Sequence, residues 1–79
     1  MKFKIVMETY RKYDGIYECI DTFKTNSTYS GYDLEMAVSL FYEGVVRYCK
    51  SLPQSPAVKK RGNSVIMGNM TYLFRREAV

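Results

Sequence analysis

The pattern of apolar and polar residues is most regular between residues 33 and 52. Apolar side chains recur there at the i, i+3, i+4, i+7 spacing that forms one stripe on an α-helix: Leu34, Ala37, Val38, Phe41, Val45, Tyr48, Cys49 and Leu52. Asp33 has the side chain of a helix N-cap, and Pro53 ends the run because it lacks a backbone donor. The pattern predicts a helix over residues 33–52 that covers a sheet. Gly44 interrupts it, and we expect another part of the backbone to approach closely there.

Two alternating runs, residues 2–12 and 16–25, predict strands before the helix. Asp14-Gly15 lies between them, and Asp-Gly in this position is a strong signal for a β-hairpin. The turn-rich residues 26–32 allow a short third strand.

The register of this hairpin has two solutions. A two-residue turn at Asp14-Gly15 opposes Ile5 to Lys24 and so mixes polar and apolar side chains on one face. A three-residue loop with Gly15 in the left-handed region opposes Ile5 to Phe23 instead. We prefer the second register, because it gathers one apolar set on one face: Phe3, Ile5, Met7, Cys19 and Phe23.

The chain after the helix divides into a loop and a strand region. Residues 52–64 contain both prolines, and we interpret them as a mobile loop. Residues 65–76 fit one long strand with a bulge at Gly68, or a hairpin with a type II′ turn at Gly68-Asn69 that gathers a cleaner apolar set. The sum is one α+β domain over residues 1–79, in which one helix packs on one face of an antiparallel sheet of three to four strands, in the order ββαβ or ββαββ.

Composition restricts the class of protein. A hydrophobic fraction of 47% and a charged fraction of 25% are typical of a globular chain, and no apolar run approaches the ~20 residues of a membrane span. The alternating N-terminus is unlike a signal peptide. We therefore expect a protein of the host-cell cytoplasm with no membrane contact, in which Cys19 and Cys49 are buried free thiols.

The chemistry available to the chain is limited. Histidine is absent, which removes the usual general base and the commonest metal ligand. Glu8, Glu18 and Asp21 would need to share a face to hold a cation, but the preferred register places Glu8 and Glu18 outside and Asp21 inside. We expect no enzymatic activity, no metal and no cofactor.

The net charge of +4 is concentrated toward the C-terminus, because residues 53–79 hold five basic residues and one acidic residue. The basic residues form one patch if the loop folds back on the last strand: Lys59, Lys60, Arg61, Arg75 and Arg76. Such a patch attracts phosphate or an acidic protein surface.

Eight tyrosines are more than one small core can hold. Tyr42 lies off the helix stripe, and Tyr10 and Tyr13 lie outside the apolar strand set, so we expect these three rings to be exposed. Tyrosine is enriched where proteins bind proteins. We expect Tyr10, Tyr13 and Tyr42 to anchor a contact with a partner.

Two resemblances extend these expectations. Residues 31–37 (GYDLEMA), followed by Phe41, Gly44, Val45 and Tyr48, resemble the start of the helix in HicB antitoxins, which also open with a β-hairpin. Tyr32 and Met36 replace acidic positions of that pattern, and the DNA-binding tail of some members is missing. The order of elements and the ending VIMGNMTYLF are similar to small phage-encoded inhibitors, including anti-CRISPR proteins.

The second resemblance implies a non-enzymatic inhibitor from a phage or mobile element. It would block a host defence complex by occupying a site on a larger protein or ribonucleoprotein. The alternatives are a small nucleic-acid-binding protein that uses the C-terminal basic patch, and a HicB-like antitoxin. An unpaired strand edge also allows a homodimer.

Overall fold

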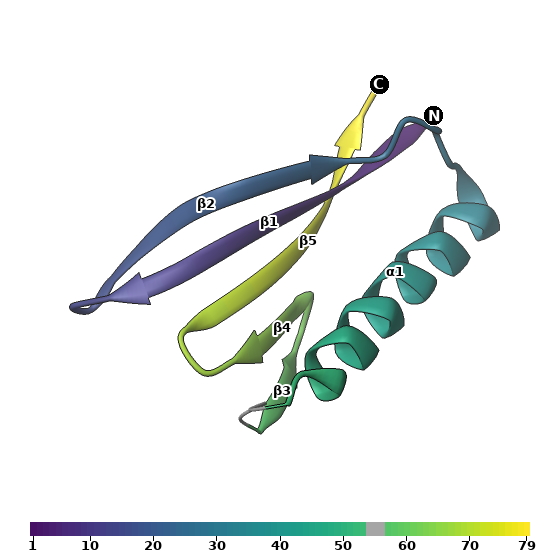
Figure 1. Cartoon of the computed structure of the whole chain (residues 1–79). Coiled ribbons are helices and arrows are strands. Elements are labelled where there is room, and N and C mark those ends of the chain that lie inside the picture. The colour runs from purple at the N-terminus through teal and green to yellow at the C-terminus, as the bar shows by residue number, and fades with distance from the viewer. Residues whose placement is uncertain (54–56) are drawn as a thin grey trace.

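A computed structural model describes residues 1–53 and 57–79, within which the chain forms one helix and five strands (Figure 1). The elements follow in the order β1 (Phe3–Tyr13), β2 (Ile16–Lys24), α1 (Gly31–Ser51), β3 (Val58–Arg61), β4 (Ser64–Met67) and β5 (Met70–Ala78). All neighbouring strands are antiparallel, and their order across the sheet is β2-β1-β5-β4-β3. The predicted α+β class is confirmed, but the sheet has more strands than the three to four expected.

Helix α1 begins two residues earlier than the sequence pattern indicates. Its N-cap is Ser30, in an extended conformation, and Asp33 lies within the first turn, where the helix dipole favours its carboxylate. The prediction that Asp33 is the N-cap was therefore wrong. The helix ends at Ser51, close to the predicted end. Apart from the backbone of the helix itself and the two neighbouring residues, no heavy atom lies within 4 Å of a Cβ built at Gly44, so the expected close approach of backbone is also wrong.

The hairpin between β1 and β2 combines a tight turn with a bulge. Asp14 and Gly15 both have positive φ, 52° and 76°, which is the type I′ turn that Asp-Gly favours. The register set by this turn holds as far as Tyr10, which pairs with Cys19. The next pair is Thr9 with Asp21, so Ile20 has no partner on β1 and forms a β-bulge. The preferred register with a three-residue loop was wrong.

The region after the helix forms strands where a loop was predicted. Strand β3 lies inside the predicted loop of residues 52–64 and pairs with β4, which corrects that prediction; residues 54–56 of the predicted loop lie outside the described residues. The hairpin alternative for residues 65–76 is confirmed. Gly68 has a φ of 60° while Asn69 does not have a positive φ, as a type II′ turn requires. The possible strand before the helix is a single bridge between Phe3 and Tyr29.

The core lies between α1 and the half of the sheet made by β3, β4 and β5, because α1 packs on these strands. Figure 1 shows the β1–β2 hairpin extending away beyond the helix. The buried core residues are Ile5, Leu34, Ala37, Val46, Cys49, Val65, Met67 and Phe74. Val46 was not in the predicted stripe, whereas Tyr48, which was, is exposed. One helix is too narrow to cover five strands, so one half of the sheet stays uncovered on this side.

Candidate binding surfaces

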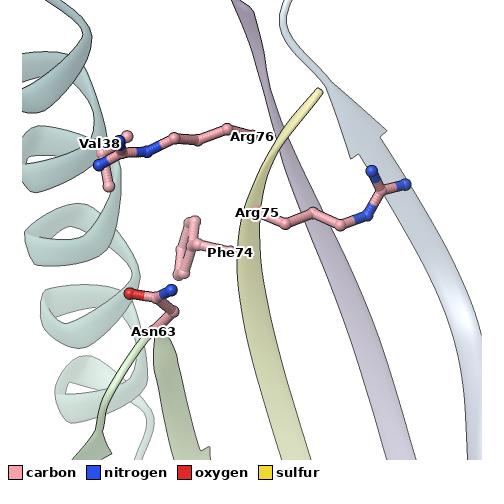
Figure 2. Close-up of a pocket in the computed structure, with 5 residues that line it drawn as sticks. All are labelled: Val38, Asn63, Phe74, Arg75 and Arg76. Carbon is pink, nitrogen blue, oxygen red and sulfur yellow. The ribbon is translucent and has the colours of Figure 1, made fainter. Parts of the chain in front are cut away.

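The sheet has a face toward α1 and a face with nothing packed on it among the described residues. Residues paired across strands share a face, and successive residues of a strand alternate between faces. Figure 2 shows Arg76 extending from β5 toward α1 while Arg75 extends the opposite way. Following this alternation through the register gives the face turned away from the helix, which we call the open face: Lys4, Val6, Glu8, Tyr10, Lys12, Tyr17, Cys19, Thr22, Lys24, Lys59, Arg61, Ser64, Ile66, Thr71, Leu73, Arg75 and Glu77.

The open face carries the whole charge excess of the chain. It holds six basic residues and two acidic residues, so its net charge is +4. The remaining six basic and six acidic residues cancel. Charge is therefore segregated by face and not by position along the chain, since three of the six basic residues, Lys4, Lys12 and Lys24, precede the helix.

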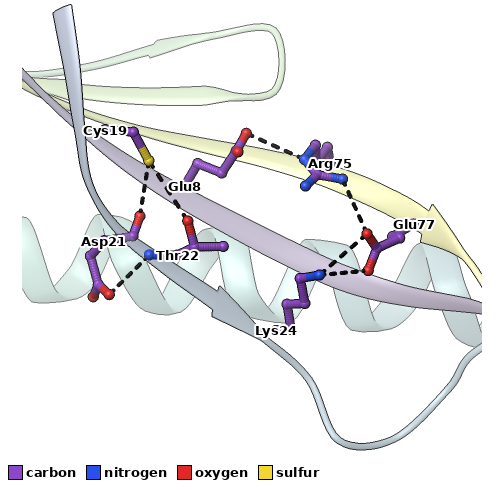
Figure 3. Close-up of polar contacts among 7 residues, drawn as sticks. All are labelled: Glu8, Cys19, Asp21, Thr22, Lys24, Arg75 and Glu77. Carbon is purple, nitrogen blue, oxygen red and sulfur yellow. Dashed lines mark hydrogen bonds and ion pairs between the residues drawn. The ribbon is translucent and has the colours of Figure 1, made fainter.

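A network of ion pairs crosses β2, β1 and β5 on the open face (Figure 3). The Nε atom of Arg75 lies 3.3 Å from Oε1 of Glu8, and Nζ of Lys24 lies 3.1 Å from Oε2 of Glu77. Val6 pairs with Lys24 on one side and Arg75 on the other, and it is fully buried although it belongs to the open face. Both carboxylates of the face are thus paired. Four basic residues have no carboxylate partner within 4.0 Å in the described part of the chain: Lys4, Lys12, Lys59 and Arg61.

Two tyrosines lie side by side among these charges. Tyr17 is 59% exposed, and Nζ of Lys12 lies 5.5 Å from the centroid of its ring. Tyr10 occupies the diagonal position on β1, and its pKa is raised by desolvation and by the negative charge of Glu8. Tyr10 therefore keeps its hydroxyl proton at neutral pH. The pair presents aromatic rings and hydrogen-bond donors next to a cation.

The side of the molecule that carries α1 has an apolar cleft. The cleft has a volume of about 360 Å³ and is lined by Tyr29, Ala37, Leu40, Phe41 and Gly44. Leu40 is 63% exposed, and Met36, one turn earlier, is also exposed. The missing side chain of Gly44 leaves this space open. The helix surface that borders the uncovered half of the sheet is therefore apolar and accessible.

Phe23 extends this apolar surface onto β2, the strand at the edge of the sheet. The ring centroid of Phe23 lies 6.3 Å from that of Phe41, and Phe23 is 47% exposed. Farther along the hairpin, beyond Asp21 and the Glu18–Arg11 ion pair, Tyr13 and Ile16 form a second exposed group on the same side. All nine residues of β2 are exposed, and in the described chain β2 pairs with β1 alone. Its second edge presents unpaired backbone N–H and C=O groups, and it reaches the border of the cleft at Phe23, whose ring contacts that of Phe41.

The predicted tyrosine anchors lie in three different environments. Tyr13 is exposed, as expected, with 75% of its surface accessible. Tyr10 is half-buried on the open face, so the expectation that its ring is exposed was wrong. Tyr42 is also half-buried: its ring centroid lies 5.8 Å from that of Phe74, and its hydroxyl donates to the carbonyl oxygen of Ser64 over 3.2 Å. The expectation that Tyr42 is exposed was wrong, because its ring packs onto the core at the border of the helix stripe.

The predicted basic patch does not form as one surface. Lys59, Arg61 and Arg75 lie on the open face, whereas alternation turns Lys60 and Arg76 toward the helix side. There Nη2 of Arg76 lies 2.6 Å from Oε1 of Glu35 on α1. Beside Arg76, a hollow of about 210 Å³ between α1 and the sheet is lined by Val38, Asn63, Phe74, Arg75 and Arg76 (Figure 2). The five residues are thus divided between two faces.

The remaining chemical candidates are also separated. Glu8 lies on the open face, while Glu18 lies on the helix side, where it pairs with Arg11; the prediction that they share a face was wrong. No group of three or more acidic or cysteine side chains among the described residues is placed to hold a metal ion. Cys49 is buried, but Cys19 is exposed on the open face, which corrects the expectation that both are buried. Within residues 1–53 and 57–79, no helix has the length and apolar character to cross a membrane.

Comparison with known proteins adds no relative. Neither a protein-family model, nor a curated protein, nor a solved structure matches the chain. The resemblances to HicB antitoxins and to small phage inhibitors therefore stay predictions.

Proposed function

We propose that this chain is a non-enzymatic binding module that docks an extended segment of a larger protein along the free edge of β2 and into the apolar cleft. The observation that carries the proposal is the adjacency of these two features. An unpaired edge offers backbone hydrogen bonds to an added strand, and a neighbouring apolar pocket gives side-chain specificity.

The composition of the surface supports a protein partner. The cleft is lined by uncharged residues, with large rings and aliphatic side chains at its border. Interface centres are depleted of charge and enriched in aromatic residues and methionine, and Phe23, Met36 and Tyr13 supply such groups here. Tyr13 is the one predicted anchor on this surface; Tyr10 and Tyr42 do not belong to it.

The wider role that we assign is steric. A bound module of this size blocks whatever else would use the same site on its partner, and no bond needs to be made or broken. This is how the small phage-encoded inhibitors that the chain resembles act, so we place it among inhibitors of a host protein or ribonucleoprotein complex.

The proposal is tested by affinity capture from a bacterial lysate with three forms of the protein. Leu40→Glu places a charge in the cleft at an exposed position, so we expect it to lose the captured partner without a change in folding. Tyr48→Glu is the matched control, because Tyr48 is similarly exposed and lies on α1 outside the cleft lining. The partner should be retained by the control and should survive nuclease treatment of the lysate.

Two results contradict the proposal. In the first, the Leu40→Glu variant captures the same proteins as the unmodified chain. In the second, nuclease treatment of the lysate removes every captured protein. A second copy of this chain could also pair with the free edge of β2 and form a dimer. Sedimentation over a range of protein concentrations detects it, and a dimer that Leu40→Glu dissociates would replace the partner proposed here.

A further inference from the structure

We infer that the open face is a binding site for single-stranded nucleic acid, with the strand running across β2, β1, β5, β4 and β3. This inference does not rest on the proposed protein contact, because it concerns the opposite face of the sheet and different residues. It also differs from a C-terminal basic patch, since half of its basic residues come from the N-terminal hairpin.

The proposed path of the nucleic acid follows one row of paired residues across the sheet. Tyr10 pairs with Cys19 on one side and Thr71 on the other, Thr71 pairs with Ile66, and Ile66 pairs with Lys59. Neighbouring β-strands lie about 4.8 Å apart, so this row of five residues is roughly 19 Å long. No acidic residue belongs to it, and it is long enough for the few nucleotides that a small stacking platform binds.

Cations stand at both ends of the row. Lys12 lies beside Tyr10 and Tyr17 at one end, and Lys59 with Arg61 lies at the other. None of the three has a carboxylate within 4.0 Å among the described residues, so each can pair with phosphate. The carboxylate beside Tyr10, that of Glu8 in the next row, is paired to Arg75. Phosphates can therefore be held at both ends, because Arg75 offsets the negative charge of the one carboxylate next to the path.

The shape and the aromatic residues favour a single strand over a duplex. A duplex groove is read by an element that protrudes into it, whereas the open face is a sheet surface. Unpaired bases stack on aromatic rings, and Tyr17 is exposed with Tyr10 diagonal to it. Ile66 adds an apolar position between Thr71 and Lys59 in the row.

Fluorescence anisotropy with labelled oligo-uridine and oligo-thymidine of about 12 nucleotides tests the site. We expect binding to at least one of them that weakens as salt is raised, and weaker binding to a duplex of the same length. Lys12→Gln with Lys59→Gln removes two phosphate contacts, which should lower the slope of log affinity against log salt by about 1.4. Tyr17→Leu should weaken binding about tenfold through loss of stacking.

Lys60→Gln is the matched control for charge. It lies next to Lys59 in sequence and removes the same charge, but alternation turns it to the helix side, so affinity and salt slope should stay those of the unmodified protein. Circular dichroism of each variant checks that the fold is retained. Lys59→Gln is also made alone, for comparison with Lys60→Gln. The inference is overturned if neither oligonucleotide binds, if Lys60→Gln weakens binding as much as this single Lys59→Gln variant, or if the duplex binds more tightly than the single strands.

Discussion

At the scale of single residues, the two cysteines show how position in the fold decides chemistry. Cys49 is fully buried, and desolvation raises the pKa of its thiol. Cys19 is exposed, and its Sγ lies 3.5 Å from the carbonyl oxygen of Asp21. The same side chain is a core residue in one place and an accessible thiol in the other, because Cys49 lies on the buried side of α1 whereas Cys19 lies on β2, all of whose residues are exposed.

We expect one thiol of the native protein to react with a thiol-specific reagent, and that thiol to be Cys19. The reactive species is the thiolate, and Cys49 is both covered and held in its protonated form. Cys49 should react more than about a hundredfold more slowly than Cys19, because the fold must open before the reagent reaches it. Absorbance of the released chromophore gives both rates. Cys19→Ser should remove the fast phase and leave the slow one; equal rates for the two thiols would show that Cys49 is not enclosed.

At the scale of elements, the bulge in β2 reconciles two requirements of the hairpin. The Asp14-Gly15 turn sets the register at one end, and the match of Phe23 to Met7 sets it at the other. These two registers differ by one residue, and Ile20 takes up the difference. Strand β2 thus contains one residue more than β1 requires.

A deletion of Ile20 should accordingly be tolerated. The pairs on both sides of the bulge are kept when the extra residue is removed, so we expect the free energy of unfolding to change by less than about 1 kcal/mol. Urea denaturation measures this change. Deletion of Thr9 is the control, because β1 is paired on both sides and has no extra residue; it should destabilise the fold by more than about 3 kcal/mol. If deletion of Ile20 proves as harmful as deletion of Thr9, the bulge is not a spare residue.

Local patterns in the sequence were sufficient for the helix and for two of the hairpin turns, but not for strand β3 or for the pairing of the strands. Helical spacing, the Asp-Gly turn and the Gly68-Asn69 turn each depend on a few neighbouring residues, and each is present in the structure. The bulge depends on a distant match between Phe23 and Met7, which no single segment contains. The open face could be predicted only with the register known, because an error of one residue exchanges the two faces of a strand.

At the scale of the whole molecule, burial of ionisable groups makes stability depend on pH. Desolvation raises the pKa of Tyr42 and Tyr72 from 10.0 and that of Cys49 from 9.0. A group whose pKa is raised by folding contributes stability below its unfolded pKa and loses that contribution as the pH rises toward the folded pKa. The contribution of the Cys49 thiol to stability therefore begins to fall near pH 9, and those of the two tyrosine hydroxyls begin to fall near pH 10.

We expect the free energy of unfolding to fall as the pH is raised above about 9, by up to about 1.4 kcal/mol per pH unit for each group that ionises only after unfolding. Urea denaturation at a series of pH values measures the fall. Tyr72→Phe removes one such group, so the decline above pH 10 should be shallower in this variant. A stability that stays constant to about pH 11 would mean that these hydroxyl and thiol groups are solvated in the native state.

The segregation of charge between the two faces has a consequence for encounters in solution. A body with all of its excess charge on one side has a large electric dipole perpendicular to its sheet, and a polyanion exerts a torque on it at distances of about a Debye length. The molecule therefore rotates before it collides and arrives with its positive side forward. The helix and the free edge of β2 then face away from the polyanion and stay accessible to a protein partner.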